Sequence, residues 1–568
     1  MRSVLRRLII IFSCIVLLCA IIIGAALTGF LTAKFENGYA NRLFVRVERK
    51  IAEVRGTPDM ADRRLARIES TFISFDGTVY KTPKENWVSG GGLAVLGSDL
   101  IVVDSQGEFM LYRDGFGIMS TNIETPENGK AAYVRLSQNP EHADLNHQPW
   151  SVRYNDVIAV ERGNSTIIIL SYTFFDEVRV CYGNRLVKIS LPSTSDLSAI
   201  TVAAEEWELL FDSTPCLAFR NTDTALVGIQ AGGRMALAPD GRLLLTMGDY
   251  AFDGLMVPEV GLMEPSVDYG KVLSIDIDSG DKRVVSVGHR NPQGIAVAKD
   301  GQIWSVEHGA RGGDELNLIV EGANYGWPKE SLGTLYNGQP FPFDGPQGRH
   351  DTYQAPSFAW LPSIGTSSIA AIDGFHESWD GGLVVGGLSQ PNIGQALYHI
   401  RTEGENVIFT ERIDIQRRVR YVVQYGDRLA VWLDPSDLLI LEKAERENPF
   451  ALAISYIDQA EDNASADEAK AILGTCNQCH SFRQDDHQRA PSMHRVVGRR
   501  VASTAYSGYS DALRSVGGVW SRDRLREFLT DPQKFAPGTQ MPAQGLKNGP
   551  ALDLVIEALA EYPPRGTL

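Results

Sequence analysis

Basic charge is scarce in this chain of 568 residues. Lysine and arginine together number 54, against 70 aspartate and glutamate residues, which gives a formal net charge of −16 at pH 7. A protein that binds nucleic acid needs basic patches to neutralise phosphates, so this balance argues against that class. An acidic surface is consistent with solubility and with basic protein partners.

Cysteine is scarce as well, with six residues that divide into three pairs. Cys14 and Cys19 lie within an apolar N-terminal run, where we expect packing or membrane-facing thiols. Cys181 and Cys216 can form a disulfide if the chain folds in an oxidising compartment, although the sequence does not show their distance. The third pair carries a chemical signature.

This third pair lies in the run 476–480 (CNQCH), which reads C-x-x-C-H, the attachment signature of a c-type haem. The thiols of Cys476 and Cys479 can each form a thioether with a haem vinyl group, and His480 then becomes the fifth iron ligand. A C-x-x-C pair also serves zinc sites and thioredoxin-like centres. The sequence has no second C-x-x-C or H-x-x-H cluster to complete a zinc site, and no βαβ pattern surrounds the pair.

The sixth iron ligand is predicted in the run 537–542 (PGTQMP), where Met541 follows His480 by 61 residues. A His/Met pair is the axial arrangement of cytochromes c and raises the reduction potential. Further matches are Pro491, the run 506–510 (YSGYS) and Trp520. About the last hundred residues therefore resemble a class I cytochrome c, a family in which the proline carbonyl orients the histidine. Met493 and His494 remain alternative ligands.

One long apolar run is present near the N-terminus. Leu8 to Ala33 is 26 residues without a charge. As a helix rising about 1.5 Å per residue it spans roughly 39 Å, more than the ~30 Å hydrocarbon core of a bilayer. Arg2, Arg6 and Arg7 precede it, so the N-terminus is expected in the cytoplasm. We expect a single-pass protein of the bacterial inner membrane with most of the chain in the periplasm. Cleavage after Ala33 is the alternative.

Helix-like periodicity is missing from the middle of the chain, about residues 70 to 443. Pairs of short β-rich runs recur there around S-D or D-G turns, at 98–99, 240–241 and 300–301. The D-G pair suits a hairpin turn with positive φ. Asp240 and Asp300 are 60 residues apart, so about 370 residues accommodate about six repeats, as in a six-bladed β-propeller. A large array of β-sandwiches is the alternative.

The expected chain is multidomain, with a mainly-β propeller, an all-α cytochrome c domain and one N-terminal transmembrane helix. Its predicted parts are a membrane anchor at 1–34, a charged spacer at 35–70, the six-bladed propeller at 71–443, a linker at 444–464 and the cytochrome c domain at 465–568. A capping box at 465–468 (SADE) is expected to open the first cytochrome helix.

Three long motifs make the propeller region more specific. They are the runs 288–294 (GHRNPQG), 307–319 (EHGARGGDELNLI) and 324–328 (NYGWP). In this order they resemble the soluble PQQ-dependent glucose and aldose sugar dehydrogenases, which are six-bladed propellers. The likeness extends from about residue 228 to 442 and is weak before that.

The resemblance implies a quinone site. Arg290 and Asn291 match the pair that binds PQQ, and Arg418 and Arg420 match an R-x-R that holds its carboxylates. Three carboxylates and an orthoquinone need fixed guanidinium groups, so these residue types suit the role. The alternatives are that Arg290 and Asn291 brace a propeller loop and that the R-x-R pair makes surface ion pairs.

The resemblance also implies two Ca²⁺ sites. The backbone carbonyls of Gly309 and Ala310 occupy the positions that ligate the cofactor-bound Ca²⁺, with Ala310 in place of a usual proline. Glu315 and Tyr325 match a second, structural Ca²⁺ site, and oxygen ligands suit this hard cation. The alternative is that Glu315 and Tyr325 hold their loop without metal.

Three departures from the family concern the pocket. The family's general base is a histidine in H-x-G-G-R, but the run 230–234 reads QAGGR, so the base position holds Gln230. A carboxamide has no useful basicity, and general base catalysis typically contributes about 10²–10⁴-fold. A basic residue expected around 388–390 (LSQ) is missing, and 88–93 (VSGGGL) stands where the family has Gln-Gly-Gly-Leu.

The histidines of the region do not replace the base in an obvious way. His142 and His147 lie in a polar loop from which one could act as a substitute base, although a solvated loop is the simpler reading. His289 and His308 are expected to be hydrogen-bonded structural residues.

Two functions compete. In the first, the chain is an oxidoreductase in which PQQ oxidises a sugar or other alcohol and the haem passes the electrons to an acceptor of the respiratory chain. In the second, the propeller is catalytically degenerate and acts as a binding or docking module for the cytochrome. Gln230 is the residue that motivates the second function.

Overall fold

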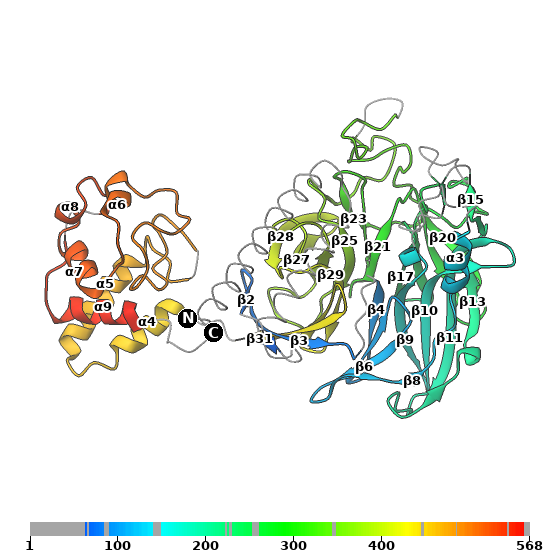
Figure 1. Cartoon of the computed structure of the whole chain (residues 1–568), viewed down its shortest axis with the longest axis horizontal. Helices are drawn as coiled ribbons and strands as arrows, with labels where there is room; N and C mark the ends of the chain where they lie inside the picture. Colours follow the sequence, from blue (N-terminus) through cyan, green and yellow to red (C-terminus); the bar gives the residue numbers. More distant parts are fainter. Residues whose placement is uncertain are drawn as a thin grey trace, which may run out of the picture.

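The computed structural model forms a β-propeller followed by a small helical domain (Figure 1). It describes residues 63–64, 67–83, 90–139, 149–221, 224–225, 230–252, 261–342, 348–444, 448–483, 486–541 and 545–561. The predicted membrane anchor and most of the predicted spacer lie outside these residues. Among the residues described, no helix is both long and apolar enough to cross a bilayer.

Six antiparallel sheets form the blades of the propeller, each built on four main strands, and short extra strands extend two of them. From the innermost to the outer strand, the first three are β4 (Gly91–Leu96), β5 (Asp99–Asp104), β6 (Phe109–Arg113) and β7 (Gly117–Ser120); β9 (Tyr154–Arg162), β10 (Ser165–Asp176), β11 (Cys181–Pro192) and β13 (Glu208–Asp212); β17 (Gly232–Leu237), β18 (Leu243–Met247), β19 (Lys271–Ile275) and β20 (Lys282–Val287).

The other three blades continue the same order. They are β21 (Pro292–Val297), β22 (Ile303–Glu307), β23 (Asp314–Leu318) and β24 (Phe358–Trp360); β25 (Thr366–Ala371), β26 (Leu383–Gly387), β27 (Ala396–Glu403) and β28 (Asn406–Asp414); β29 (Val419–Tyr425), β30 (Arg428–Leu433), β31 (Asp437–Ala444) and, from the N-terminal side, β3 (Ser74–Lys81). The prediction of a six-bladed propeller is confirmed.

The ring is closed by strands from the two ends of the propeller. Strand β3 pairs antiparallel with β31 along its whole length, from Ser74 opposite Ala444 to Lys81 opposite Asp437. The innermost strands contact one another around the circle, in the order β4, β9, β17, β21, β25, β29 and back to β4. Strands β1 (Arg63–Arg64) and β2 (Ile68–Glu69) also pair with β3, so the end of the predicted spacer belongs to the last sheet.

The predicted hairpins form where the D-G pairs stand. Gly241 joins β17 to β18 with φ 81°, and Gly301 joins β21 to β22 with φ 88°, in the left-handed region that glycine adopts readily. Many strands are apolar on both faces because each sheet is packed between two neighbours. The fully buried Trp304, Trp379 and Trp432 lie in three different clusters of this core.

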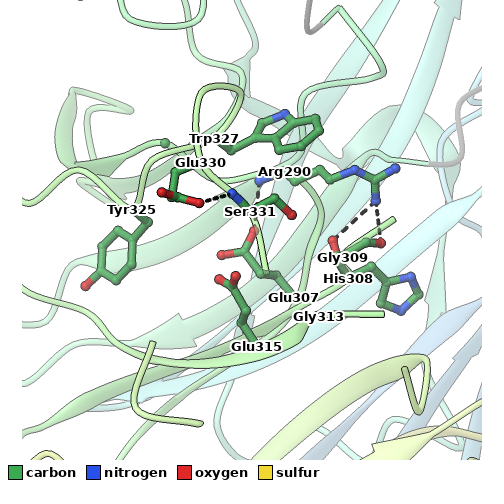
Figure 2. A pocket seen from close by; sticks show the side chains of 11 residues that line it. Arg290, Glu307, His308, Gly309, Gly313, Glu315, Tyr325, Trp327, Glu330 and Ser331 are labelled. Carbon is green, nitrogen blue, oxygen red and sulfur yellow. Dashed lines mark hydrogen bonds between the residues drawn. The ribbon is translucent and has the colours of Figure 1, made fainter. Parts of the chain in front are cut away.

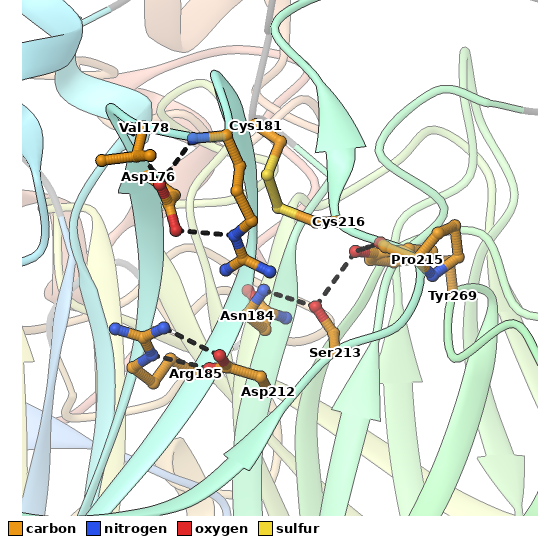
Figure 3. Close-up of a disulfide and its surroundings, with 11 residues drawn as sticks. Asp176, Val178, Cys181, Asn184, Arg185, Asp212, Ser213, Pro215, Cys216 and Tyr269 are labelled. Carbon is orange, nitrogen blue, oxygen red and sulfur yellow. Dashed lines mark hydrogen bonds and ion pairs between the residues drawn. A yellow bond between two sulfur atoms is a disulfide. The ribbon is translucent and has the colours of Figure 1, made fainter.

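The second blade contains a disulfide between Cys181 and Cys216, whose Cα atoms are 5.6 Å apart (Figure 3). Cys181 begins β11, and Cys216 precedes β14 (Leu217–Ala218), which pairs with the start of β11. The pairing that the sequence left open is therefore present in the structure. Smaller elements of the propeller are β8 (Asn122–Ile123), β12 (Thr201–Val202), β15 (Arg220–Asn221), β16 (Thr224–Ala225), α3 (Lys130–Ser137) and the 3₁₀ turns Pro149–Ser151 and Ala204–Glu206.

The helical domain has a core of its own. Its helices are α4 (Pro449–Ile457), α5 (Asn463–Cys476), α6 (Asp511–Val516), α7 (Arg522–Thr530), α8 (Pro532–Phe535) and α9 (Pro550–Glu561). On α9, Leu552, Val555, Ile556 and Leu559 recur at helical spacing and are buried against α4, α5 and α7.

Two details at the start of this domain differ from the sequence prediction. The region 444–464, expected to be a linker, contains α4, which buries Ala453 and Ile457 in the helical core. Helix α5 begins two residues before the predicted capping box, because Asp462 is the N-cap and its side chain accepts a hydrogen bond from the Ala464 N–H.

Candidate functional site

The propeller axis is occupied by Arg234, which lies on β17 and is 4% exposed. Its guanidinium donates to one backbone carbonyl on each of the other five blades. The acceptors are Gly91 (2.9 Å), Asn155 (2.7 Å), Gln293 (3.1 Å), Ser367 (3.3 Å) and Arg420 (3.3 Å). Asp156 lies 3.9 Å away, and the guanidinium stacks over the Tyr421 ring. Arg234 thus connects the blades at the centre of the ring.

A small cavity adjoins this arginine. Its lining comes from the beginnings of the innermost strands or the residues just before them. The lining residues are Gly90, Arg153, Asn155, Gly232, Arg234, Gln293 and Arg420. Arg420, one of the residues predicted to bind the quinone, belongs to this lining. Asn291, another of them, lies next to it, because its side chain accepts a hydrogen bond from the Gln293 amide at 2.7 Å. These predicted quinone residues therefore lie at one end of the propeller axis.

Gln230, at the base position of the family, is buried next to a carboxylate. With its amide nitrogen turned toward Asp249, that nitrogen donates to Oδ1 at 2.5 Å and the amide oxygen accepts from Arg290 Nη2 at 3.1 Å. Asp249 also accepts from Trp327 Nε1 at 2.7 Å and from the Ala251 N–H at 2.8 Å. Gln230 can therefore orient a neighbouring group through its amide but cannot remove a proton.

Arg290 is fixed through both its backbone and its side chain. Its backbone N–H donates to Glu307 Oε2 at 2.8 Å, and its guanidinium donates to the carbonyls of His308 (3.2 Å) and Gly309 (2.7 Å). The guanidinium also lies 5.3 Å from the centre of the Trp327 ring. These contacts brace the 307–310 loop, and they engage the Gly309 carbonyl that was predicted to ligate Ca²⁺.

Arg418 and Arg420 share one buried carboxylate, that of Asp434. Arg418 donates to it at 3.1 Å, and Arg420 donates at 2.8 and 3.2 Å. Although burial alone raises the pKa of Asp434, the two guanidinium groups hold it below its usual range. Arg420 is 6% exposed and Arg418 is 39% exposed, so Arg418 is the one open to solvent.

A second small cavity lies beside Arg290 and is rich in carboxylates (Figure 2). Glu307, Glu315 and Glu330 all line it. Burial, together with the neighbouring Glu307 carboxylate, raises the pKa of Glu315 well above its usual range. Within the described part of the chain, no three histidine, cysteine, aspartate or glutamate side chains are grouped closely enough to hold a metal ion.

The other residues predicted to surround Ca²⁺ make protein contacts. The Tyr325 hydroxyl donates to the Leu318 carbonyl and accepts from the Val320 N–H at 3.0 Å, and its ring stacks on His289. Ala310 is half-buried against the propeller core. The contacts of Tyr325 are those expected if it holds its loop, and its role at a Ca²⁺ site stays a prediction.

His289 and His308, the two histidines expected to be structural, are both hydrogen-bonded within the propeller. His289 is fully buried between Ser286 Oγ at 2.8 Å and Glu307 Oε1 at 2.9 Å. His308 donates through Nε2 to the Thr366 carbonyl at 2.5 Å. His142 and His147 lie outside the described residues.

The haem signature lies at the end of α5. Cys476 is the last residue of the helix, and the N–H groups of Cys479 and His480 both donate to its carbonyl, at 3.1 and 2.9 Å. His480 Nδ1–H donates a hydrogen bond to the Pro491 carbonyl at 2.7 Å. This bond keeps the proton on Nδ1, so that Nε2 is the nitrogen that can bind iron. Burial lowers the pKa of His480 and raises that of Cys476 to about 11.

Met541 lies at the end of a loop that α8 organises. Gln533 on α8 accepts from the Gly538 N–H at 3.1 Å and donates to the Thr539 carbonyl at 2.9 Å. Met541 itself is half-buried and packs against the helical core. The alternative ligand Met493 also packs against this core, in a segment that Arg499 braces.

Comparison with known proteins identifies this domain. Over 126 residues the chain is 36% identical to a cytochrome c homolog of Rickettsia conorii, and the match covers 22% of this chain and 72% of the relative. The C-terminal domain belongs to the cytochrome c family. The contact between His480 and the Pro491 carbonyl is the arrangement expected from the resemblance.

The propeller matches a family model described as Glucose / Sorbosone dehydrogenase over residues 156–438. Quinoprotein glucose dehydrogenase B of Acinetobacter calcoaceticus is 33% identical over 120 residues, which cover 17% of this chain and 25% of that protein. A crystal structure of glucose dehydrogenase aligns with a TM-score of 0.50 at 25% identity, covering 65% of this chain and all of that one. The chain is thus a sugar dehydrogenase-like propeller joined to a cytochrome c.

The match to the curated propeller relatives is partial. An uncharacterised protein of Synechocystis is 32% identical over 244 residues. The match covers 39% of this chain and 55% of that protein.

Two residues of the propeller site were not predicted from the sequence, and hairpin register could have found both. Residue 249 lies across the β17–β18 hairpin from Gln230, because Gly232 is opposite Met247. Asp434 lies across the β29–β30 hairpin from Arg418, because Val419 is opposite Leu433.

Proposed function

We propose that this chain is a quinoprotein oxidoreductase. PQQ bound in the propeller would oxidise a CH–OH group of a sugar or other alcohol, and the haem c of the cytochrome domain would receive the electrons. The observation that carries the proposal is the cluster of guanidinium groups at one end of the propeller axis, in a chain that also holds a cytochrome c. A two-electron centre and a one-electron carrier together form a complete relay.

The residues present fit a planar cofactor with several carboxylates. Arg290 and Asn291 would hold it from the residues just before β21, and Arg418 and Arg420 from the start of β29, because guanidinium forks match carboxylate geometry. Asp434 now occupies Arg420 and part of Arg418. Arg418, the exposed member of the pair, is the one that can turn toward a ligand while Arg420 keeps its ion pair.

When bound, PQQ supplies a quinone carbon that accepts a hydride from the substrate. The residues of this chain leave the removal of the substrate hydroxyl proton without an obvious base. Gln230 can accept or donate a hydrogen bond to the substrate hydroxyl, but it cannot take its proton. Asp249 orients the amide from behind and is itself held by Trp327. The proposal therefore predicts slow turnover, limited by proton removal.

Ca²⁺ is part of the proposal as well. Glu315 stands in a cavity with two further carboxylates, where a divalent cation would allow it to remain ionised. The Gly309 and Ala310 carbonyls are the other predicted donors, and Arg290 now occupies the first of them. A cation there would require Arg290 to release this carbonyl.

The cytochrome domain would accept the electrons from the propeller and pass them on. Cys476 and Cys479 would attach the haem, and His480 and Met541 would ligate its iron. We also propose that the chain is anchored by the run 8–33 in the bacterial inner membrane, with the propeller and the cytochrome in the periplasm. An acceptor of the respiratory chain is the expected partner.

The test is to load the purified full-length protein with PQQ and Ca²⁺, add aldoses and record the haem spectrum. Reduction of the haem that depends on both PQQ and sugar supports the proposal. Tight binding of PQQ without any reduction would leave the propeller as a quinone-binding module. No binding of PQQ would favour the degenerate docking module, the function that Gln230 motivates.

A further inference from the structure

Asn184 connects the second blade to the place where the family has its general base. The residue lies on β11 and is fully buried. Its amide Nδ2 donates to the Ala231 carbonyl at 2.7 Å, and its amide Oδ1 accepts from the Tyr250 hydroxyl at 2.6 Å. Ala231 follows Gln230 in the chain, and Tyr250 follows Asp249. One side chain therefore holds the immediate neighbours of both members of the Gln230–Asp249 pair.

The orientation of this amide is fixed by its partners. Burial raises the pKa of Tyr250, so its hydroxyl keeps its proton and is the donor to Oδ1. The Ala231 carbonyl can only accept, so it faces Nδ2. Nδ2 also donates to Met247 Sδ at 3.5 Å. An apolar side chain in place of Asn184 would remove all three contacts at once.

The turn that follows Asp249 has a backbone that needs support from its surroundings. Tyr250 and Ala251 have φ values of 51° and 65°, in the left-handed region that residues other than glycine seldom adopt. The Tyr250 N–H donates to the Gln230 carbonyl at 3.2 Å, and a Cβ atom at Gly248 would collide with that carbonyl oxygen. The two segments are in contact, so a shift of Tyr250 would move Asp249 relative to Gln230.

Asn184 reaches this pair from a well-anchored part of the second blade. Its backbone N–H donates to Ser213 Oγ at 2.8 Å, and its carbonyl accepts from the Ser213 N–H at 2.9 Å (Figure 3). The Ser213 hydroxyl lies 3.0 Å from that of Tyr269, which donates to the Pro215 carbonyl at 2.7 Å. Cys216 comes next in the chain, and the disulfide joins it to the start of β11. The backbone of Asn184 is therefore held in place before its side chain makes any contact.

We propose that Asn184 is a positioning residue for the Gln230–Asp249 pair. It fixes the two segments so that the Gln230 amide donates to Asp249 and accepts from Arg290 in a single orientation. The amide then directs its remaining N–H and lone pair toward the substrate hydroxyl. The effect on turnover rests on the proposed function, whereas the fixed geometry of the pair does not, so the two can be tested separately.

The first experiment is hydrogen exchange measured by mass spectrometry on the full-length protein with haem and without PQQ. In Asn184→Ala the segments 230–234 and 248–252 are expected to exchange roughly 10-fold faster, the effect of losing a buried hydrogen bond. Tyr250→Phe removes only one of the contacts and should have a smaller effect. Unchanged exchange in both segments would overturn the positioning role, and so would faster exchange throughout the propeller, which would mark Asn184 as a general structural residue.

Asn128→Ala is the matched control. Asn128 is also a buried asparagine, and its side chain accepts from the Lys130 N–H at 3.1 Å at the start of α3, outside both segments. We expect its loss to leave the exchange of 230–234 and 248–252 unchanged. An equal effect of Asn128→Ala and Asn184→Ala on these segments would overturn the positioning role.

The second experiment loads the same proteins with PQQ and Ca²⁺, adds an aldose and records haem reduction. Asn184→Ala is expected to lower kcat about 10–100-fold while KM and the Kd of PQQ change little, because a misplaced group costs rate and not uniform binding. The double variant Asn184→Ala/Tyr250→Phe should be little slower than Asn184→Ala, since the second change removes a contact already lost.

The outcomes separate the two claims. A raised KM with unchanged kcat in Asn184→Ala would overturn the effect on turnover. No haem reduction by the unsubstituted protein would overturn the proposed function, and hydrogen exchange would still decide whether Asn184 fixes the pair. If Asn184→Ala does not fold, Tyr250→Phe decides both points, because it keeps the ring and removes only the hydroxyl.

Discussion

Replacing Arg234 with methionine tests the claim that one side chain connects the blades. Methionine keeps much of the side chain's length and apolar stem but removes all five hydrogen bonds to the carbonyls of the other blades. The carboxylate of Asp156 loses its cation at the same time.

The expected cost follows from these contacts. A single buried acceptor left without a donor costs about 1–3 kcal/mol, and breaking a buried charged pair costs about 3–5 kcal/mol. The costs are not additive, because the five carbonyls share one donor group and the adjoining cavity has a polar lining that can satisfy part of the loss. We therefore expect the free energy of unfolding of the propeller to fall by about 3–5 kcal/mol.

Urea unfolding measures this loss. Circular dichroism in the β-sheet region follows the propeller, and haem absorbance follows the cytochrome domain independently. With an m-value of about 3 kcal/mol/M or more, the propeller midpoint should fall by roughly 1 M, and the cytochrome midpoint should not move. Arg135→Met is the control, because Arg135 makes an exposed ion pair with Glu177 that contributes little. Equal propeller midpoints for the two variants would refute the reasoning.

Four further predictions concern the two sites and the disulfide. Gln230→His should raise PQQ-dependent sugar oxidation by about 10²-fold or more, measured as the rate of haem reduction, and adding Asp249→Asn should remove most of the gain; no gain would show that more than the base is missing. Asp434→Asn should lower the urea midpoint at pH 7, and the loss should shrink gradually as the pH falls below the unfolded carboxyl pKa of about 4, because a carboxyl with a depressed folded pKa gives its full stability above the unfolded pKa and loses it as the pH falls toward the folded value; a loss that does not change with pH would contradict this. Cys181→Ser should destabilise the propeller by about 3–4 kcal/mol for a loop of 35 residues, and a reducing agent should abolish the difference from the unsubstituted protein in thermal melts. Met541→Ala should lower the haem reduction potential in a spectroscopic redox titration and remove the methionine ligand band, whereas Met493→Ala should change neither; the reverse would exchange their roles.

The sequence reasoning succeeded where function or fold depends on local spacing. The D-G turns predicted the hairpins because such a pair fixes a turn whatever the surroundings. The C-x-x-C-H run needs only five residues in order, and the proline predicted to orient His480 lies 11 residues further on. Six blades followed from the repeat length alone.

What the sequence did not show depends on contacts made across the ring. The strand that completes the last blade comes from residues 74–81, more than 350 residues from its partner β31. Arg234 was read as the end of a motif, and its bonds to five blades require the ring to be closed. Arg153, Arg234 and Arg420 likewise come together only in the closed ring, where they line one cavity at one end of the axis.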